Sequence, residues 1–185
     1  TDTTPEIAEE IGAEVVTGPP SRGGQIGRGC ALAKADWLLI LHADTQLDPG
    51  WAAVVADHLR TGAPGHFRLA YDATGTGPAI TAAWANLRAR LFRLPYGDQG
   101  LLIRAEDLRA AGGVPDIPLM EDVALVRRLP RLAALPATAR TSFARYAAEG
   151  WLQRGSRNLI LLLRYLCGTD PNVLAQAYRR SSRRS

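Results

Sequence analysis

The chain has 185 residues, enough for one domain with a sizeable hydrophobic core. Apolar residues make up 46% of the sequence, which excludes a disordered protein. The net charge is +4, and its excess lies near the end of the chain, in Arg179, Arg180, Arg183 and Arg184. A basic tail of this kind suits an anionic surface, although it is also typical of a solvated terminus.

The cysteine content and the apolar segments favour a cytoplasmic protein. Cys30 and Cys167 lie far apart in the sequence, and two such cysteines make no disulfide framework. No stretch has the features of a secretory signal. The longest apolar segment, residues 158–168, is too short to span a bilayer and contains Arg164.

Hydrophobic periodicity and turn residues predict the elements of the first half of the chain. A helix capped by Thr4 opens the sequence. The elements expected after it are a strand at 13–17, a loop at 19–24, a helix at 25–35, a strand at 37–43, a helix at 48–62 that Asp48 caps, a strand at 65–72 and a helix at 79–94.

The second half continues with fewer strands. The elements expected there are a strand at 97–104, helices at 105–113 and 121–133, the latter broken at Pro130, a strand at 138–146, and helices at 149–168 and 170–182. No internal repeat or linker is present, so we expect one domain. Alternating strands and helices predict an α/β fold with a mainly parallel sheet and helices on both faces.

The apolar run at 37–41 is followed by two polar residues that are candidates for chemistry, His42 and Asp44. Ligands of parallel α/β sheets bind beyond the carboxyl ends of strands, so Asp44 is expected at the edge of the sheet beside a ligand. The two side chains can share one side of the strand end and hold a hard divalent cation. The alternative is a turn aspartate beside a core histidine.

Three further acids follow later in the chain. Glu121 and Asp122 open a helix after a loop stiffened by Pro115 and Pro118, where a fixed carboxylate can act as a general base or simply cap the helix. Asp98 precedes an apolar strand, as turn aspartates often do.

Basic and aromatic residues give weaker signals. The segment 21–29, SRGGQIGRG, lacks the glycine order of a phosphate loop, but Arg22, Arg28 and the amides of a helix start make an anion site plausible. Trp37, Trp51, Trp84 and Trp151 are expected in the core or at an interface. Aromatic and basic residues do not interleave as they do on an RNA surface, so we expect no nucleic-acid partner.

Taken in order, these motifs resemble a family 2 glycosyltransferase of the GT-A fold. The stretches that carry the resemblance are residues 21–51, "GHFRL" at 65–69, "YGDQGLLIR" at 96–104 and "AGGVPDIPLMEDVALVRRL" at 111–129. The sequence is most similar to a bacterial subgroup associated with radical-SAM and selenoprotein genes, which also has a histidine at the position of His42.

The resemblance implies a role for each candidate residue. Asp44 matches the last aspartate of the D-x-D metal motif, with His42 in the place of the first. Asp122 matches the base that deprotonates the acceptor hydroxyl, and Glu121 is its supporting acid. The residues expected to contact the donor are Gly97, Asp98 and Gln99 beside the sugar, and Asp2, Arg22 and Gln25 beside the nucleotide.

The implied reaction is a metal-dependent, inverting transfer of a sugar from a nucleotide diphosphate to a hydroxyl of an unknown acceptor, with Mg²⁺ or Mn²⁺ as cofactor. Residues 1–147 would form the GT-A domain, and 148–185 amphipathic helices of the same domain. Family members begin with a strand that ends in an acidic loop, and only "TDTT" of this loop is found at 1–4, so we expect that strand to precede Thr1.

Two other functions are alternatives, a nucleotidyltransferase of related fold and a non-catalytic binding module. The C-terminal helices have an apolar surface wider than one domain needs, with Leu159, Leu162, Leu163 and Leu166 at helical spacing. We expect the first half of this surface to pack within the monomer. The second half is expected to contact a second copy or, in preference, an anionic membrane at the inner face of the cell membrane.

Overall fold

The computed structural model describes residues 3–182, with side chains up to position 180. Its helices are α1 (Thr4–Glu10), α2 (Arg22–Leu32), α3 (Trp51–Leu59), α4 (Thr76–Phe92), the 3₁₀ helix η1 (Gly97–Gln99), α5 (Ala105–Ala110), α6 (Glu121–Val126), α7 (Ala144–Glu149), α8 (Trp151–Leu166) and α9 (Pro171–Ser182). Its strands are β1 (Trp37–Ile40), β2 (Thr45–Leu47), β3 (Gly65–Tyr71), β4 (Leu101–Arg104) and β5 (Ala133–Thr141).

The five strands form one sheet in the order β1-β4-β3-β5-β2. The pairs β1–β4, β4–β3 and β5–β2 are antiparallel, and β3–β5 is parallel. The α/β class with flanking helices is therefore confirmed, but the prediction of a mainly parallel sheet is wrong. Alternation of strands and helices along a sequence does not fix the direction in which each strand re-enters the sheet. Here β4 returns antiparallel to β3 after α4 and η1.

Several predicted elements differ because strand pairing decides them. Residues 13–17 form a loop rather than a strand, and almost all of them are exposed, since no neighbouring strand pairs with them. Residues 133–141 form β5 although they are rich in alanine, because they pair with both β3 and β2. The segment after Ser142, predicted as strand, is helix α7 instead.

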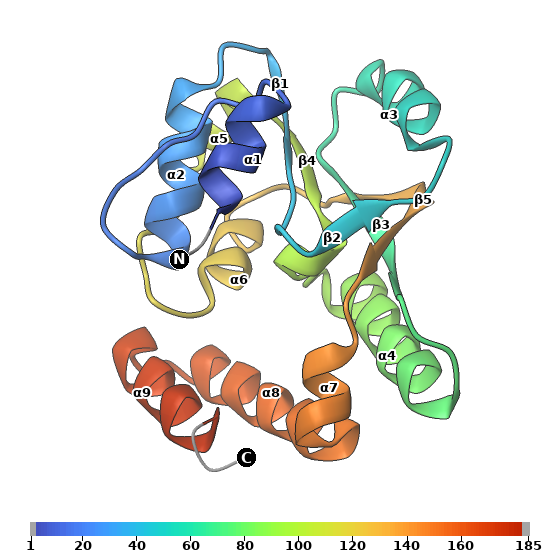
Figure 1. Cartoon of the computed structure of the whole chain (residues 1–185), viewed down its shortest axis with the longest axis vertical. Coiled ribbons are helices and arrows are strands. Elements are labelled where there is room, and N and C mark those ends of the chain that lie inside the picture. Colours follow the sequence, from blue (N-terminus) through green and yellow to red (C-terminus); the bar gives the residue numbers. More distant parts are fainter. Residues whose placement is uncertain (1–2, 183–185) are drawn as a thin grey trace.

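Helices surround the sheet at its faces and ends. α4 packs on β3, α3 on β5 and α5 on β4. In Figure 1, α1, α2 and α5 group near β1 and β4, whereas α7, α8 and α9 form a row at the bottom.

The C-terminal helices belong to the core. Leu161 and Leu162 of α8 and Leu174 of α9 are buried in one cluster with Leu119 and Val123, at and just before α6. Other apolar side chains of these two helices remain exposed: Leu152, Ile160, Leu163, Leu166 and Val173. In the second half of α8 we expected the apolar surface to contact an external partner. One side of this half, with Leu161 and Leu162, is instead buried within the monomer.

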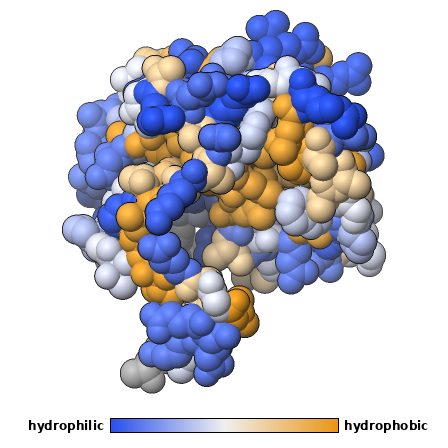
Figure 2. All heavy atoms as spheres, turned by 90° about the horizontal axis from the view of Figure 1, so that it is seen from above, coloured by the Kyte–Doolittle hydropathy of each residue, from blue (hydrophilic) through white to orange (hydrophobic). Residues whose placement is uncertain are grey.

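The surface, the cysteines and the helix lengths add three observations. The face in Figure 2 carries hydrophilic residues over much of its area, with apolar groups between them. Cys30 and Cys167 are both free thiols, and burial raises the pKa of Cys30. Within residues 3–182, no helix combines the length and the apolar character needed to cross a membrane.

Candidate active site

A cleft of about 170 Å³ opens where β3 and β5 end. Tyr71, the last residue of β3, and Thr141, the last of β5, both line it. The cleft thus lies at the carboxyl ends of the two parallel strands, as expected for an α/β fold. Six predicted site residues line it: Arg22, His42, Asp44, Asp98, Glu121 and Asp122.

His42 and Asp44 lie in the turn between β1 and β2. β1 ends at Ile40, earlier than predicted, and the turn is closed by the Thr45 N–H, which donates to the His42 carbonyl at 3.1 Å. The Asp44 side chain is exposed at the cleft. A Cβ on Gly97 would lie 2.3 Å from His42 Nε2, so the ring packs directly on the backbone of η1.

Asp98 lies in η1 with an unusual environment for a carboxylate. Its Oδ1 atom is buried and has no hydrogen-bond partner among the described residues. Burial raises the pKa of Asp98, and the negative charges of Asp122 and Asp44 raise it further, against the opposing effect of Arg88 and His42.

Arg88 of α4 is the buried cation on this side of the site, with 6% of its surface exposed. Its Nε donates to the Leu94 carbonyl at 2.9 Å, and its guanidinium lies 3.3 Å from the centre of the Tyr96 ring. Burial raises the pKa of the Tyr96 hydroxyl to about 12. Arg88 therefore supplies positive charge beneath the acidic cleft without occupying it.

The Glu121–Asp122 pair follows a residue with unusual backbone geometry. Met120 adopts a left-handed conformation, with φ of 67°, and it is buried. Such strain persists only where the surroundings hold it, and it turns the chain so that both acids reach the cleft.

Asp122 is anchored through both carboxylate oxygens. The Gly97 N–H donates to Oδ2 at 2.9 Å, and the Val123 N–H donates to Oδ1 at 2.7 Å. Each oxygen keeps a second lone pair, so the anchored group can still accept a proton or a hydrogen bond. The bond to Gly97 also ties α6 to η1.

Glu121 is the more buried acid, with 2% of its surface exposed. Burial raises its pKa and Asp122 adds to the increase, whereas Arg22 lowers it. Its Oε1 lies 3.2 Å from Arg22 Nε, and its Oε2 is buried without a partner in the described chain. Glu121 thus holds Arg22 at the mouth of the cleft.

The start of α2 is joined to the loop before α6. The Ser21 hydroxyl accepts from the Gly24 N–H at 3.2 Å and donates to Asp116 Oδ1. A Cβ on Gly23 would lie 1.8 Å from the Pro115 carbonyl oxygen, so only glycine allows this approach. We call these contacts of Ser21 and Gly23 with residues 115–116 the 23/115 seam. It places Arg22 beside Glu121.

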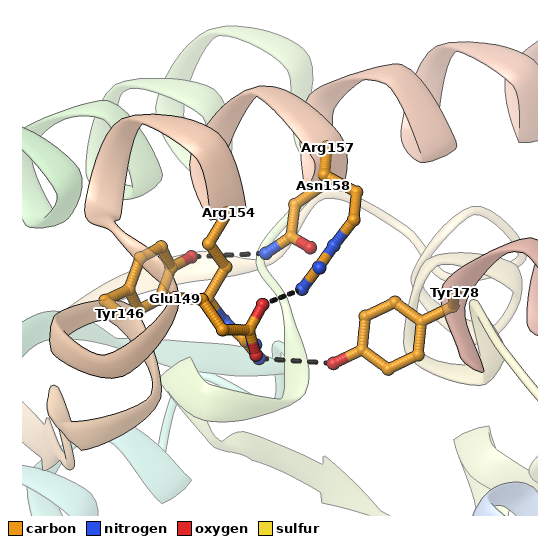
Figure 3. A network of polar contacts seen from close by, with 6 residues as sticks. All are labelled: Tyr146, Glu149, Arg154, Arg157, Asn158 and Tyr178. Atoms are coloured by element: carbon orange, nitrogen blue, oxygen red, sulfur yellow. Dashed lines mark hydrogen bonds and ion pairs between the residues drawn. The ribbon is translucent and has the colours of Figure 1, made fainter. Parts of the chain in front are cut away.

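The C-terminal helices form the wall opposite the acids. Figure 3 shows Glu149 between Arg154 and Arg157, with bonds to both guanidinium groups. Arg154 also donates to the Tyr178 hydroxyl at 3.2 Å, and Asn158 donates to the Tyr146 hydroxyl at 3.3 Å. Of these six residues, four line the cleft: Tyr146, Arg154, Asn158 and Tyr178.

Sequence reasoning missed this wall entirely. The residues missed elsewhere around the cleft are Tyr71, Tyr96, Thr141 and Ser142; those missed in the wall are Arg145, Tyr146, Arg154, Asn158 and Tyr178. No motif marks them, because their approach to the acids depends on how α7–α9 fold back. The one available signal was the spacing of Arg154, Asn158 and Leu161, which places them on one side of a helix.

Three of the predicted donor-site residues that the structure describes do not line the cleft. Gln25 is exposed beside it, in a separate recess with Asp116. Gln99 is fully buried, and its Nε2 donates to the Phe67 carbonyl at 3.3 Å. Gly97 lines an adjoining apolar hollow through its backbone. Asp2 lies outside the described residues.

The donor atoms suit a divalent cation only if a substrate completes the site. Within residues 3–182, no group of three or more His, Cys, Asp or Glu side chains is placed to hold a metal. Asp44 alone offers an exposed carboxylate at the cleft, with His42 nearby in the same turn. Mg²⁺ typically takes one or two carboxylates and completes its shell with phosphate and water, so the residues fit that type of site.

Comparison with known proteins identifies the family. The family model described as glycosyl transferase family 2 matches residues 1–99, and the chain belongs to this family. Neither the curated proteins nor the solved structures contain a match. The chain is therefore a glycosyltransferase in the general sense.

Proposed function

We propose that the chain is an inverting glycosyltransferase that transfers a sugar from a nucleotide diphosphate to an acceptor hydroxyl. The supporting observation is the gathering of Asp44, Asp98, Glu121 and Asp122 in one cleft, with Arg22 at its mouth. Four carboxylates would repel a diphosphate, so a cation must offset them. This favours a divalent metal held by Asp44, with His42 as a second ligand.

In this proposal Asp122 is the general base. Its two backbone hydrogen bonds fix the carboxylate, and a free lone pair accepts the proton as the acceptor oxygen attacks the anomeric carbon. The diphosphate leaves on the opposite side, so one displacement inverts the centre. Such a base contributes roughly two to four powers of ten in rate.

Arg22 and the cation act on the leaving group. Arg22, held by Glu121, donates to the diphosphate as negative charge builds on it. When bound, Mg²⁺ or Mn²⁺ supplies Lewis-acid stabilisation of the same charge. The wall of Tyr146, Arg154, Asn158 and Tyr178 faces the acids, and we assign it to the acceptor.

The experiment is a thermal-shift panel of nucleotide-diphosphate sugars with and without Mn²⁺, followed by transfer assays on the best ligand. Donor binding raises the melting temperature by mass action. Asp44→Asn should abolish the metal-dependent shift, and Asp122→Asn should keep it but lose transfer. Asp57→Asn, at an exposed pair, is the control.

Four outcomes would contradict the proposal. Unchanged metal-dependent affinity in Asp44→Asn would show that Asp44 is not a metal ligand. An inactive Glu121→Gln together with an active Asp122→Asn would make Glu121, rather than Asp122, the general base. Nucleotide binding with no transfer to any acceptor would favour the binding module, and release of pyrophosphate from a nucleoside triphosphate would favour the nucleotidyltransferase.

Finer assignments are also proposals. We assign the chain to the subgroup associated with radical-SAM and selenoprotein genes on its His42–Asp44 and "MED" motifs, and to the cytoplasm on its cysteine content. Residues 148–185 are assigned to the same domain as 1–147, because Leu161 and Leu174 share a core cluster with Val123. A homodimer through the exposed residues of α8 stays a prediction, whereas we place the membrane contact, first expected at α8, on another helix, as argued below.

A further inference from the structure

Helix α4 has an apolar stripe that no described residue covers. Ile80, Trp84, Leu87 and Leu91 recur at intervals of four, three and four residues, which places them on one face of the helix. Their exposed fractions are 49%, 42%, 44% and 61%. A tryptophan exposed in the middle of such a stripe is typical of an interface.

A basic groove borders this stripe. It has a volume of about 610 Å³ and lies between α4 and the amino-terminal parts of β3 and β5. Four arginines line it: Arg68, Arg90, Arg93 and Arg131. Leu87 belongs to both the stripe and the groove wall, so the two features are continuous.

The groove arginines lack counter-charges. None of the four takes part in the ion pairs found among the described residues. The described residues that line the groove include no acid, and the sequence has none between Asp72 and Asp98. A cationic surface of this extent beside an apolar stripe is complementary to an anionic, amphiphilic partner.

We infer that the stripe and groove of α4 form a docking surface for an anionic membrane. Trp84 and its apolar neighbours would enter the boundary between headgroups and acyl chains, and the groove arginines would bind lipid phosphates. A two-fold dimer through the same surface is disfavoured, because it would bring arginines against arginines without acids to pair them.

The position of the surface keeps the cleft accessible. The groove lies at the beginning of β3 and β5, beside His66 and Ala133, whereas the cleft lies at their ends, beside Tyr71 and Thr141. Docking through α4 therefore leaves the cleft open to a soluble donor. The inference does not depend on the proposed transferase reaction, since it concerns binding alone.

The test is sedimentation of the whole chain with vesicles of phosphatidylcholine alone or mixed with phosphatidylglycerol. We expect strong preference for the anionic vesicles, weakened by high salt. Arg90→Gln/Arg131→Gln should lower binding roughly 25-fold, because each arginine near an anionic surface contributes about a factor of five. Trp84→Ala/Leu91→Ala should lower it at least ten-fold.

Matched variants at the C-terminal helices serve as controls. Leu152→Ala/Leu163→Ala removes an exposed apolar pair from α8, and Arg179→Gln/Arg180→Gln removes two charges from α9. Both should bind as the wild type does. Anionic vesicles should also shift the tryptophan emission of the wild type to the blue, and this shift should be absent in Trp84→Phe.

Several results would overturn the inference. Equal sedimentation with neutral and anionic vesicles would exclude charge recognition, and loss of binding only in the α8 or α9 variants would assign the contact to the C-terminal helices. A dimer in light scattering that Trp84→Ala/Leu91→Ala converts to monomer, without vesicle binding, would assign the stripe to a second copy.

Discussion

At the scale of single residues, glycines fix the relative positions of the catalytic candidates. Gly23 allows α2 to contact the Pro115 carbonyl, and Gly97 allows the His42 ring to lie on η1. Within SRGGQIGRG, Gly23 is therefore needed for chain packing, apart from any role in an anion site. The anion site predicted there stays a prediction.

Gly23→Ala should destabilise the protein by about 1–3 kcal/mol, because the new methyl group forces the 23/115 seam apart. It should also weaken donor binding, since Arg22 moves away from Glu121. Urea unfolding measures the first effect and the thermal-shift assay the second.

Gly29→Ala, in the same helix, is the matched control. No atom lies within 4 Å of a Cβ placed there, so alanine should stabilise α2 by up to about 1 kcal/mol. Equal behaviour of the two variants would show that the close approach at Gly23 does not constrain the fold.

Asp48 gives a prediction about pH. It was expected to cap α3, but Gly50 occupies that position and Asp48 binds Arg140 through two bonds, at 3.0 and 2.8 Å. The hydrogen bond from Arg140 lowers the pKa of Asp48. The pair's contribution to stability is thus fully present above the unfolded pKa of about 3.9, and it is lost as pH falls through the lower folded value.

The difference in unfolding free energy between wild type and Asp48→Asn should therefore stay constant above about pH 5 and shrink below about pH 4. Denaturant titrations across this range measure it. Asp57→Asn, which breaks a largely exposed pair with Arg60, should show little difference at any pH. A difference for Asp48→Asn that grows as the pH falls would contradict the assignment.

At the scale of elements, a side chain completes the edge of a strand. β4 pairs with β3 only at Gly65, so β3 has a free edge beyond that point. Asn86 of α4 fills it by accepting from the Leu69 N–H at 2.9 Å and donating to the Leu69 carbonyl at 3.0 Å. Gln99 approaches the same Asn86 oxygen at 3.4 Å, which links α4 to η1.

Asn86→Leu should cost about 2–3 kcal/mol, because it leaves both backbone groups of Leu69 without partners. Gln176→Ala, on the exposed side of α9, should change stability by less than about 0.5 kcal/mol. Chemical denaturation of the two variants measures both changes in the free energy of unfolding. A neutral Asn86→Leu would mean that water replaces the amide without loss.

The elements also show what a sequence can and cannot predict. Motifs with local causes were predicted well: the strand before His42, and the helix that opens at Glu121. The predictions that failed depended on strand pairing. Residues 13–17 have no partner strand and form a loop, whereas β5 is a strand because it pairs on both sides. The α7–α9 wall could not be predicted, because residues distant in sequence meet there only after the helices have packed.

At the scale of the whole molecule, a buried charge cluster joins the C-terminal helices to one another beside the cleft. The side chains of Glu149, Arg154 and Arg157 are only 15%, 9% and 14% exposed. Arg154 reaches Tyr178 of α9 and lines the cleft, so the cluster connects α7, α8 and α9 at the site.

Glu149→Gln should destabilise the protein by about 3 kcal/mol, because it leaves two buried guanidinium groups without a counter-charge. Glu106→Gln, which breaks an exposed pair with Arg104, should cost less than about 1 kcal/mol. Thermal unfolding compares the two. Similar melting temperatures for both variants would show that the cluster is effectively solvated.

The 23/115 seam has a consequence for amide hydrogen exchange. Because Gly23 lies against the Pro115 carbonyl and Ser21 bonds Asp116, the first turn of α2 cannot separate from the loop before α6 without breaking both contacts. The amides of Gly24 and Ile117 should then exchange with one shared opening free energy, although 93 positions separate them in the sequence. Two stretches that carry separate motifs would thus open and close as a single cooperative unit.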